Sequence, residues 1–552
     1  MLNGGCKRHL WTKKRASRTA SLAFASRSDR AKTVLNPAIT ASPKPWSAES
    51  PIYPSIFHDR PALGSVFYPS HHPPDAMAII INPATHSQSP APEGHLKLGY
   101  LWMISLVAAL GGLLFGYDWV VIGGAKPFFE RYFSLDSESL KGWANSCALI
   151  GCLFGALAAG ALSDRFGRKR LLVLAAVLFA VTSIGNALAQ SFTLFVAWRM
   201  LGGTAIGLAS GLSPLYIAEV APASMRGRLV SVNQLTIVIG ILLAQVVNWS
   251  LVRHLPVGAT NEFIASSWFG QTSWRWMFGL TAIPAALFFV GMTLVPESPR
   301  WLRKNNRPDE ARAVLAKIGG AEYAAAAMVE IDSTLADETA KVDFRELLNP
   351  RLIQVLVIGV TLAVFQQWCG INVIFNYAEE IFKAAGYDIS SVLSNIAWTG
   401  SVNLVFTFVA LGTVDRFGRR PLMLGGSIGL AVIYTATGIC FATGVTGLPV
   451  LLLVLAAIGC YSMSLAPVTW VIISEIFPNR IRGAAMSVAV CSLWIACFIL
   501  TYTFPMLNKS LGSHGTFFLY AAICVLGFVF ILWRLPETKG KSLEQIEKDL
   551  VD

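Results

Sequence analysis

Charged residues are scarce in this chain. They make up 14% of its 552 residues, whereas a soluble domain carries about 25%. Hydrophobic residues account for 54% of the chain, and the mean hydropathy is +0.55. Because a water-exposed surface needs more charge than this, the composition excludes an ordinary soluble globular protein.

Motifs of metal sites and nucleotide-driven chemistry are also lacking. The nine cysteines form no Cys-x-x-Cys pair and no cluster with histidine, and the chain has no phosphate-binding P-loop. We therefore expect no metal, no cofactor, no ATPase of its own and no enzyme activity. Eight cysteines lie in apolar stretches, where this residue behaves as a small hydrophobe: Cys147, Cys152, Cys369, Cys440, Cys460, Cys491, Cys497 and Cys524.

Apolar stretches dominate what is present. Stretches long enough to cross a bilayer, about 20 residues each, recur from Leu98 to Trp533. The sequence predicts an all-α integral membrane protein with twelve transmembrane helices. The predicted segments are 98–123, 142–162, 171–190, 192–217, 229–252, 275–295, 352–382, 391–413, 421–443, 447–474, 484–507 and 515–534.

Basic residues gather in the loops of one side. The loop 444–449 has no charge and the loop 508–515 has only Lys509, so the positive-inside rule places the even-numbered loops and both termini in the cytoplasm. The net charge of +12 is thus a topology signal, and we expect membrane lipid rather than nucleic acid as a partner. The basic residues after segments 2, 4, 8 and 10 are Arg165, Arg168, Lys169, Arg170, Arg226, Arg228, Arg416, Arg419, Arg420, Arg480 and Arg482.

The chain divides into five parts. Residues 1–97 are rich in Pro, Ser, Ala and basic residues and cannot bury a core, so they are expected to be a disordered extension. Their composition resembles an organelle transit peptide, but Met77 could be the translation start, and we favour this second interpretation. We expect a six-helix half at 98–295, a cytoplasmic link with short helices at 296–350, a second six-helix half at 351–535 and a cytoplasmic tail at 536–552.

Asp118 is a lone carboxylate inside the first apolar segment. An ionised group there costs several kcal/mol unless it is paired, hydrated or protonated. Asp118 lies about 20 residues into an outward-running helix and Arg199 about seven into an inward-running one, so a rise of 1.5 Å per residue puts both at similar depth. Two interpretations remain: a structural ion pair, or a proton carrier whose protonation releases Arg199.

Two loop motifs occur twice. The run 164–170 after segment 2 recurs at 415–421 after segment 8, and the run 216–228 recurs at 473–483. Two six-helix halves in parallel repeat are the plan of major facilitator transporters, which hold substrate between the halves. The repeated charges predict a cytoplasmic gate network that forms in one state and breaks in the other: Asp164, Arg165, Arg168, Glu219, Arg226, Asp415, Arg416, Arg419, Glu475 and Arg482.

Further motifs are more specific. They are Pro-Glu-Ser-Pro-Arg-Trp at 296–301, Gln-Gln-Trp-Cys-Gly-Ile-Asn at 366–372, Pro-Glu-Thr-Lys-Gly-Lys at 536–541 and the glycine-rich run 202–210. With these, the chain from about residue 98 to 549 resembles the sugar porter family of the major facilitator superfamily, most closely its bacterial proton-coupled xylose symporters.

The resemblance implies a substrate site in the membrane. Amides both donate and accept hydrogen bonds, as sugar hydroxyls require, and aromatic faces cover the C–H surface of a sugar ring. From the residues alone, intramembrane amides are as often helix-packing contacts as ligand contacts. The implied sugar-contacting residues are Phe115, Gln234, Gln366, Gln367, Asn372, Tyr377, Asn403, Trp470 and Trp494.

Some positions depart from the pattern of the xylose symporters. Leu493 stands where they have a sugar-contacting Gln, Asn376 replaces the first of two paired tyrosines, and Thr281 replaces a Glu near the proton site. These changes leave the sugar class intact but put xylose itself in doubt. The family's symporters use the Asp–Arg pair that matches Asp118 and Arg199, and its animal facilitators carry Asn at the Asp position.

The predicted function is symport of a monosaccharide, a pentose or hexose, with a proton by alternating access, carried out by a monomer in the cell membrane. The proton is the only coupling ion that we expect. Two alternatives stay open: a facilitative uniporter of a sugar or polyol, and a membrane sugar sensor.

Overall fold

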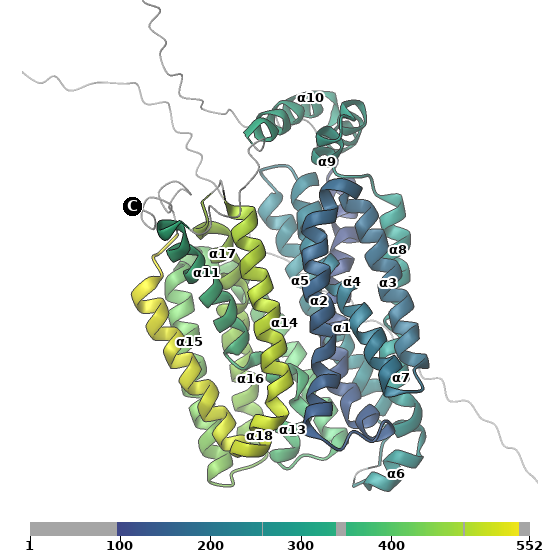
Figure 1. Ribbon diagram of the computed structural model, residues 1–552, viewed down its shortest axis with the longest axis vertical. Helices are drawn as coiled ribbons and strands as arrows, with labels where there is room; N and C mark the ends of the chain where they lie inside the picture. The colour runs from purple at the N-terminus through teal and green to yellow at the C-terminus, as the bar shows by residue number, and fades with distance from the viewer. Residues whose placement is uncertain (1–95, 257, 338–348, 479–480, 540–552) are drawn as a thin grey trace, which may run out of the picture. The chain divides into compact units, whose positions relative to one another are not determined.

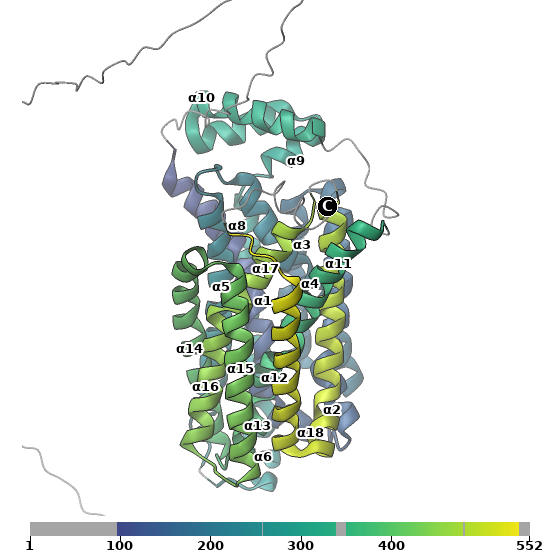
Figure 2. The same ribbon diagram turned by 90° about the vertical axis from the view of Figure 1, so that its left-hand side faces the viewer.

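The computed structural model describes residues 96–256, 258–337, 349–478 and 481–539 of the chain (Figures 1 and 2). All of them belong to one compact unit. Every regular element within these ranges is a helix, in agreement with the predicted all-α class. Of the predicted extension, residues 1–95 lie outside the described residues. The backbone N–H of Lys97 donates to the carbonyl of Ile318 at 2.7 Å.

The first half of the bundle contains predicted segments 1 to 6. Two of its helices begin at serine caps: the hydroxyls of Ser137 and Ser191 accept the N–H groups of Leu140 at 3.2 Å and Leu194 at 3.4 Å, which stabilises a helix start. Its elements are α1 Leu98–Tyr132, α2 Glu138–Phe166, α3 Arg168–Leu188, α4 Phe192–Val220, α5 Arg226–Val252, α6 Asn261–Ser266, the π-helical turn η1 Phe269–Ser273, α7 Trp274–Gly279 and α8 Ala282–Leu294.

Glycine permits the close helix crossings of this half. A Cβ on Gly203 of α4 would lie 1.9 Å from the carbonyl oxygen of Ala148 on α2. A Cβ on Gly240 of α5 would lie 2.0 Å from that of Leu113 on α1. No side chain fits at either position unless the helices move apart, so glycine sets the spacing of both helix pairs, as small residues do in membrane bundles.

The second half contains predicted segments 7 to 12, and Figure 1 shows its helices running alongside those of the first half. Between the halves, α9 Pro299–Lys304 and α10 Pro308–Asp337 form the described part of the link, and α10 bends at Gly320 (φ 84°). The elements of the second half are α11 Pro350–Trp368, α12 Ile371–Asn376, α13 Ala378–Ala384, α14 Ile389–Phe417, α15 Arg419–Ala442, α16 Leu448–Met463, α17 Leu465–Ile476 and α18 Arg482–Arg534.

The number of membrane crossings agrees with the prediction. Within the described residues, 11 helical stretches are long and apolar enough to cross a membrane. One of them, α18, has 53 residues, about 80 Å at 1.5 Å per residue, more than twice a hydrocarbon core. It reverses at Gly512 (φ 68°), where a left-handed backbone favours glycine. Divided there, α18 supplies two crossings and the total is twelve.

The predicted end of segment 1 at residue 123 was wrong. Helix α1 continues to Tyr132 through Lys126 and Pro127. A lysine and a proline follow the apolar run at residues 126 and 127. The helix continues because Lys126 is buried and paired with acidic side chains, so the charge is not exposed to hydrocarbon.

Three predicted segments are interrupted rather than continuous. Segment 7 is divided into α11, α12 and α13 by Gly370 (φ 90°) and Tyr377, and segment 10 into α16 and α17 at Ser464. Segment 6 is divided at Leu280 and Thr281. Broken helices free backbone groups and side chains at membrane depth, and transporters tolerate them where the chain lines a binding site.

Candidate functional site

Asp118 and Arg199 are in direct contact. The Nη1 of Arg199, on α4, donates to both carboxylate oxygens of Asp118, on α1, at 3.1 and 3.0 Å. The two residues are 5% and 2% exposed. The guanidinium also lies 5.3 Å from the ring centre of Phe278 on α7, a cation–π contact. The structure therefore contains the pair expected from helix depth, within the first half of the bundle.

The amides of segment 7 form a continuous hydrogen-bond chain. Nε2 of Gln366 donates to the hydroxyl of Tyr461 at 2.9 Å, and Nε2 of Gln367 donates to Oε1 of Gln366 at 2.5 Å. Nδ2 of Asn372 donates to Oε1 of Gln367 and lies 3.8 Å from Sγ of Cys497. All three amides are buried. The hydrogen-bond chain spans the break at Gly370 between α11 and α12.

Aromatic rings from both halves meet beside this chain. Trp494 of α18 lies 6.2 Å from Phe115 and 5.9 Å from Trp119, both on α1, measured between ring centres. Trp494 and Cys497 are one turn apart on α18 and share a face, so the rings adjoin the end of the amide chain. Sequence reasoning missed Trp119, although an aromatic residue next to Asp118 was a visible signal.

The other expected sugar contacts are placed separately. Asn403 on α14 accepts from the hydroxyl of Ser462 at 2.7 Å, and the hydroxyl of Tyr377 donates to the carbonyl of Thr501 at 2.6 Å. Gln234 on α5 is half-buried and Trp470 on α17 is 39% exposed. Within the described part of the chain, neither makes a side-chain hydrogen bond or ring contact.

A buried charge cluster that the sequence analysis missed lies at the end of the bundle near α6 and α13, called here the opposite end. Lys126 of α1 is 1% exposed. Its ammonium pairs with Glu380 of α13, lies 3.7 Å from Glu130 and 4.5 Å from the ring centre of Tyr377. The Lys126–Glu380 pair joins the two halves. A lysine inside an apolar stretch was the signal that could have found it.

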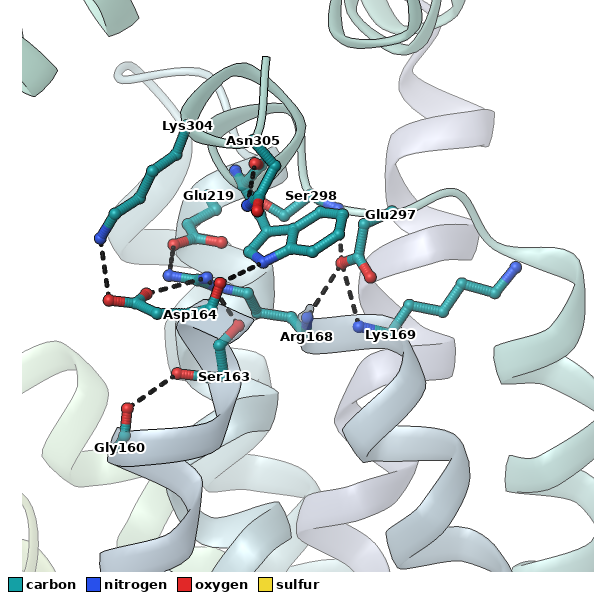
Figure 3. Close-up of polar contacts among 11 residues, drawn as sticks. Gly160, Ser163, Asp164, Arg168, Lys169, Glu219, Glu297, Ser298, Lys304 and Asn305 are labelled. Atoms are coloured by element: carbon teal, nitrogen blue, oxygen red, sulfur yellow. Dashed lines mark hydrogen bonds and ion pairs between the residues drawn. The ribbon is translucent and has the colours of Figure 1, made fainter. Parts of the chain in front are cut away.

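The loop after α2 forms the first of two charge clusters at the basic end, where α9 lies (Figures 1 and 3). Arg168 donates to Asp164 at 3.2 Å and pairs with Glu219 of α4 at 3.0 Å. Lys304 of α9 pairs with Asp164 at 2.8 Å. The loop is thereby tied to α4 and to the link.

Glu297, within the motif at 296–301, caps helix α3. One of its oxygens accepts the backbone N–H groups of Arg168 and Lys169, both at 3.0 Å (Figure 3). A carboxylate at a helix N-terminus satisfies unpaired N–H groups and the positive end of the helix dipole. Gly167 (φ 92°) makes the preceding turn, and a Cβ there would lie 2.2 Å from an oxygen of Glu297.

The second half repeats this device. Glu537, within the motif at 536–541, accepts the N–H groups of Arg419 at 3.0 Å and Arg420 at 3.1 Å at the start of α15. Gly418 has φ 93°, and Arg419 pairs with Glu475 of α17 at 3.2 Å. The two Pro-Glu motifs are therefore equivalent helix caps. Their repetition in the sequence was the signal, and their role had not been inferred.

The remaining gate residues are not all in the clusters. The side chains of Arg165, Arg226 and Arg416 are exposed and form no ion pair among the described residues. Arg482 donates to the carbonyl of Phe477 at 3.2 Å. The side chain of Asp415 lies outside the described residues. Within those ranges, none of the ion pairs described above joins the first basic-end cluster to the second.

Comparison with known proteins places the chain in a family. Residues 104–550 match the family described as "Sugar (and other) transporter". The D-xylose-proton symporter of Escherichia coli is 40% identical over 479 residues, covering 81% of this chain and 95% of the relative. The glucose transport protein of Synechocystis is 40% identical over 473 residues (83% and 99%), and the arabinose-proton symporter of Bacillus subtilis 38% over 460 (83% and 97%).

Solved structures give the same result. A partially occluded inward-open structure of the Escherichia coli xylose transporter matches with a TM-score of 0.71 and 38% identity, over 80% of this chain and 100% of the other. The proton:xylose symporter bound to 6-bromo-6-deoxy-D-glucose matches with a TM-score of 0.69 and 40% identity, over 82% and 99%. The chain belongs to the sugar transporter family and has the twelve-helix fold of the major facilitator superfamily, whose members here are multi-pass membrane proteins.

Proposed function

We propose that this protein couples the uptake of a monosaccharide, a pentose or hexose, to the movement of a proton. The observation that carries the proposal is the buried Asp118–Arg199 pair. It lies on α1, the helix whose Phe115 and Trp119 meet Trp494 of the second half. Relatives named as xylose-proton and arabinose-proton symporters support the same assignment.

The amide chain and the aromatic rings form the proposed sugar site. Gln366, Gln367 and Asn372 now hydrogen-bond to one another, so sugar hydroxyls would replace these bonds without leaving an amide unpaired. Phe115 and Trp494 would cover the apolar face of the ring. The apolar Leu493 next to Trp494 is buried and offers no hydrogen bond. A small neutral polyol fits this chemistry better than an anion or a cation.

Gln234, Asn403, Tyr377 and Trp470 are the outer members of the proposed site. Asn403 and Tyr377 already have hydrogen-bond partners. The side chains of Gln234 and Trp470 are partly exposed. Gln234 belongs to the first half and Trp470 to the second. We propose that these two residues reach the sugar when the halves approach each other around it, the alternating-access movement of this fold.

Proton coupling would work through a change of charge at Asp118. While ionised, the carboxylate holds the guanidinium of Arg199 on α4. Protonation removes the attraction and frees Arg199 to move. Because the pair lies within one half, its loss changes the packing of α1 against α4, and α1 carries two of the aromatic residues that face the sugar.

The two ends of the bundle suit opposite gating roles. At the opposite end Lys126 and Glu380 join the halves, so this end is held closed by a buried ion pair. We propose that the basic-end network forms the second gate. Its members are Asp164, Arg165, Arg168, Glu219, Arg226, Asp415, Arg416, Arg419, Glu475 and Arg482. Among the described residues, its Arg168–Glu219 and Arg419–Glu475 pairs each lie within one half.

The basic end is proposed to face the cytoplasm. Its arginine-rich loops obey the positive-inside rule, which places both termini, the link 296–350 and the tail 536–552 in the cytoplasm of a cell whose plasma or inner membrane holds the protein. The halves 98–295 and 351–535 would move against each other. A monomer suffices for this cycle, because all the proposed contacts lie in one chain.

Uptake into proteoliposomes tests the proposal. Purified protein is reconstituted, and labelled xylose, glucose, galactose, arabinose and inositol are offered with and without an inward proton gradient. We expect accumulation of at least one sugar above the external concentration with the gradient, and loss of that accumulation when a protonophore is added. Equal uptake with and without the gradient would instead identify a facilitative uniporter. Binding without flux would identify a sensor.

A further inference from the structure

Three residues that each have a buried, unpartnered polar atom line one small cavity beside the coupling pair. The atoms are Nε of Arg199, Oδ1 of Asn145 and Oδ1 of Asn376, and none has a hydrogen-bond partner within the described residues. The three side chains are 2%, 5% and 4% exposed. All three line a cavity of about 10 Å³, whose remaining lining includes Trp119. Buried polar groups rarely lack partners, so three such residues around one cavity need a reason.

The chemistry of the three atoms is complementary to a single water molecule. The Nε–H of Arg199 is a donor, and the two amide oxygens are acceptors. A water can accept one hydrogen bond and donate two, and a cavity of roughly 10–15 Å³ is enough to hold one. The amide nitrogen of Asn145 donates to the carbonyl of Lys141 at 2.9 Å. This bond fixes the amide so that its oxygen is the atom left for the cavity.

The cavity also connects the two halves. Asn145 lies on α2 and Arg199 on α4, both in the first half, whereas Asn376 ends α12 in the second half. Asn376 precedes the break at Tyr377, one turn after the amide Asn372. A bridge through this cavity would therefore join the coupling arginine to the segment that carries the proposed sugar amides.

We propose that Asn145, Arg199 and Asn376 form a binding site for one water molecule that stabilises the guanidinium while Asp118 is protonated. This inference rests on the proposed proton coupling. Arginine stays charged in proteins, so protonation of Asp118 leaves a buried cation without its counter-ion, which is strongly unfavourable. A water held by two amide oxygens accepts a charge-assisted hydrogen bond from Arg199. The site lowers the cost of the protonated state.

The groups around the pair are mostly uncharged. The other titratable groups that interact with the pair are Tyr117 of α1 and the thiols Cys147 and Cys152 of α2. A phenol and thiols are ordinarily neutral at pH 7. No second carboxylate or ammonium forms an ion pair with Asp118 or Arg199 among the described residues. We therefore attribute a change in the pH profile of transport to this pair.

The test replaces each asparagine by leucine, which fills similar space but offers no acceptor. In Asn145→Leu and Asn376→Leu the water no longer stabilises the state in which Asp118 is protonated. A higher proton concentration is then needed to populate that state. We expect the pH of half-maximal gradient-driven uptake to move to the acid side by about one unit, a tenfold rise in proton concentration. Because one water serves both residues, the double variant should shift no further than either single variant.

Alanine separates hydration from packing. Asn145→Ala enlarges the cavity and admits a second water in place of the amide oxygen, so its shift should be smaller than that of Asn145→Leu. If Asn145 were only a packing residue, Asn145→Ala should have the larger effect of the two variants, because the smaller side chain leaves the larger void. The pH dependence of sugar binding to purified protein gives a second readout that needs no flux.

Asn248→Leu is the matched control. Asn248 of α5 is fully buried, donates to the carbonyl of Val121 at 3.0 Å and has an unpartnered Oδ1, but it does not line the cavity. Its pH profile should match that of the unmodified protein. Unshifted profiles in folded Asn145→Leu and Asn376→Leu would overturn the water site while leaving proton coupling intact. A pH-independent unmodified protein would instead refute the coupling itself.

Discussion

Asp118→Asn is the substitution that examines the mechanism most directly. Asparagine has the shape of aspartate and keeps one oxygen that can accept from Nη1 of Arg199, but it cannot carry a proton. In the unmodified protein both oxygens accept from that nitrogen, at 3.1 and 3.0 Å. The substitution removes the charge, keeps one of the two hydrogen bonds and freezes the site in its neutral form.

The structure sets the size of the folding penalty. Stranding one partner of a buried ion pair costs about 3–5 kcal/mol. The hydrogen bond that Arg199 keeps to the asparagine oxygen still stabilises the fold by roughly 1.5–3 kcal/mol, because its donor is charged. A net loss of about 2 kcal/mol follows from these two ranges, and Arg199 also keeps its contact with Phe278. We therefore expect the variant to fold, with a lower melting temperature. If the pair were only structural, this would be its whole effect.

The assay compares uphill uptake, counterflow and sugar binding in one preparation. One pH unit supplies about 1.4 kcal/mol per proton, enough for tenfold accumulation by one-to-one symport. The unmodified protein should approach this ratio, whereas Asp118→Asn should accumulate nothing above the external concentration yet still bind sugar and catalyse exchange. Among the described residues Asp118 accepts only from Arg199 and makes no hydrogen bond to the amide chain, so binding should survive. Normal uphill uptake by Asp118→Asn would refute the proton-carrier role.

Four further outcomes are expected. Gln367→Ala leaves amide and sugar groups unpaired, at about 1–3 kcal/mol each, so calorimetry should show at least tenfold weaker binding; unchanged binding would remove this residue from the site. Lys126→Met breaks the buried link to Glu380 and should lower the melting temperature by an amount equivalent to about 3–5 kcal/mol, and no change would show that the pair does not hold the halves together. Glu297→Ala removes the cap of α3 and should cost about 1 kcal/mol in the same melting assay without changing sugar affinity; a loss of affinity would contradict a purely structural cap. A chain that begins at Met77 keeps every transport motif and should insert and transport like the full chain, and failed insertion would show that residues 1–76 act in targeting.

The sequence predicted the bundle but not its irregularities. Twelve apolar segments are readable because a backbone in hydrocarbon must satisfy its own hydrogen bonds, which makes each segment a helix wherever it is long enough. The continuation of α1 through Lys126 and Pro127 was not readable. Whether a charge ends a helix or is buried depends on the partner that another helix supplies, and Glu380 belongs to the other half.

The coupling pair and the amide chain were predicted to different degrees. Two opposite charges at equal depth in adjacent helices are costly to leave unpaired. Asp118 and Arg199 could therefore be paired from helix geometry and the family resemblance. The contacts between Gln366, Gln367 and Asn372 could not, because they depend on the break at Gly370 that separates α11 from α12. Gln234 and Trp470 were assigned to the same site by resemblance, and their contact with sugar stays a prediction.

By itself the sequence determined the class, the number of membrane crossings and the two-fold repeat, because these depend on local hydropathy and on motifs continuous in the chain, and the family resemblance implied the residue types offered to a sugar. Only the tertiary structure decided which buried polar atoms meet. Asn145, Arg199 and Asn376 come from three helices in two halves, and no spacing in the chain predicts that they line one cavity. The reason is physical: helix rotation and tilt, set by glycine contacts and packing between helices, determine which polar groups face one another.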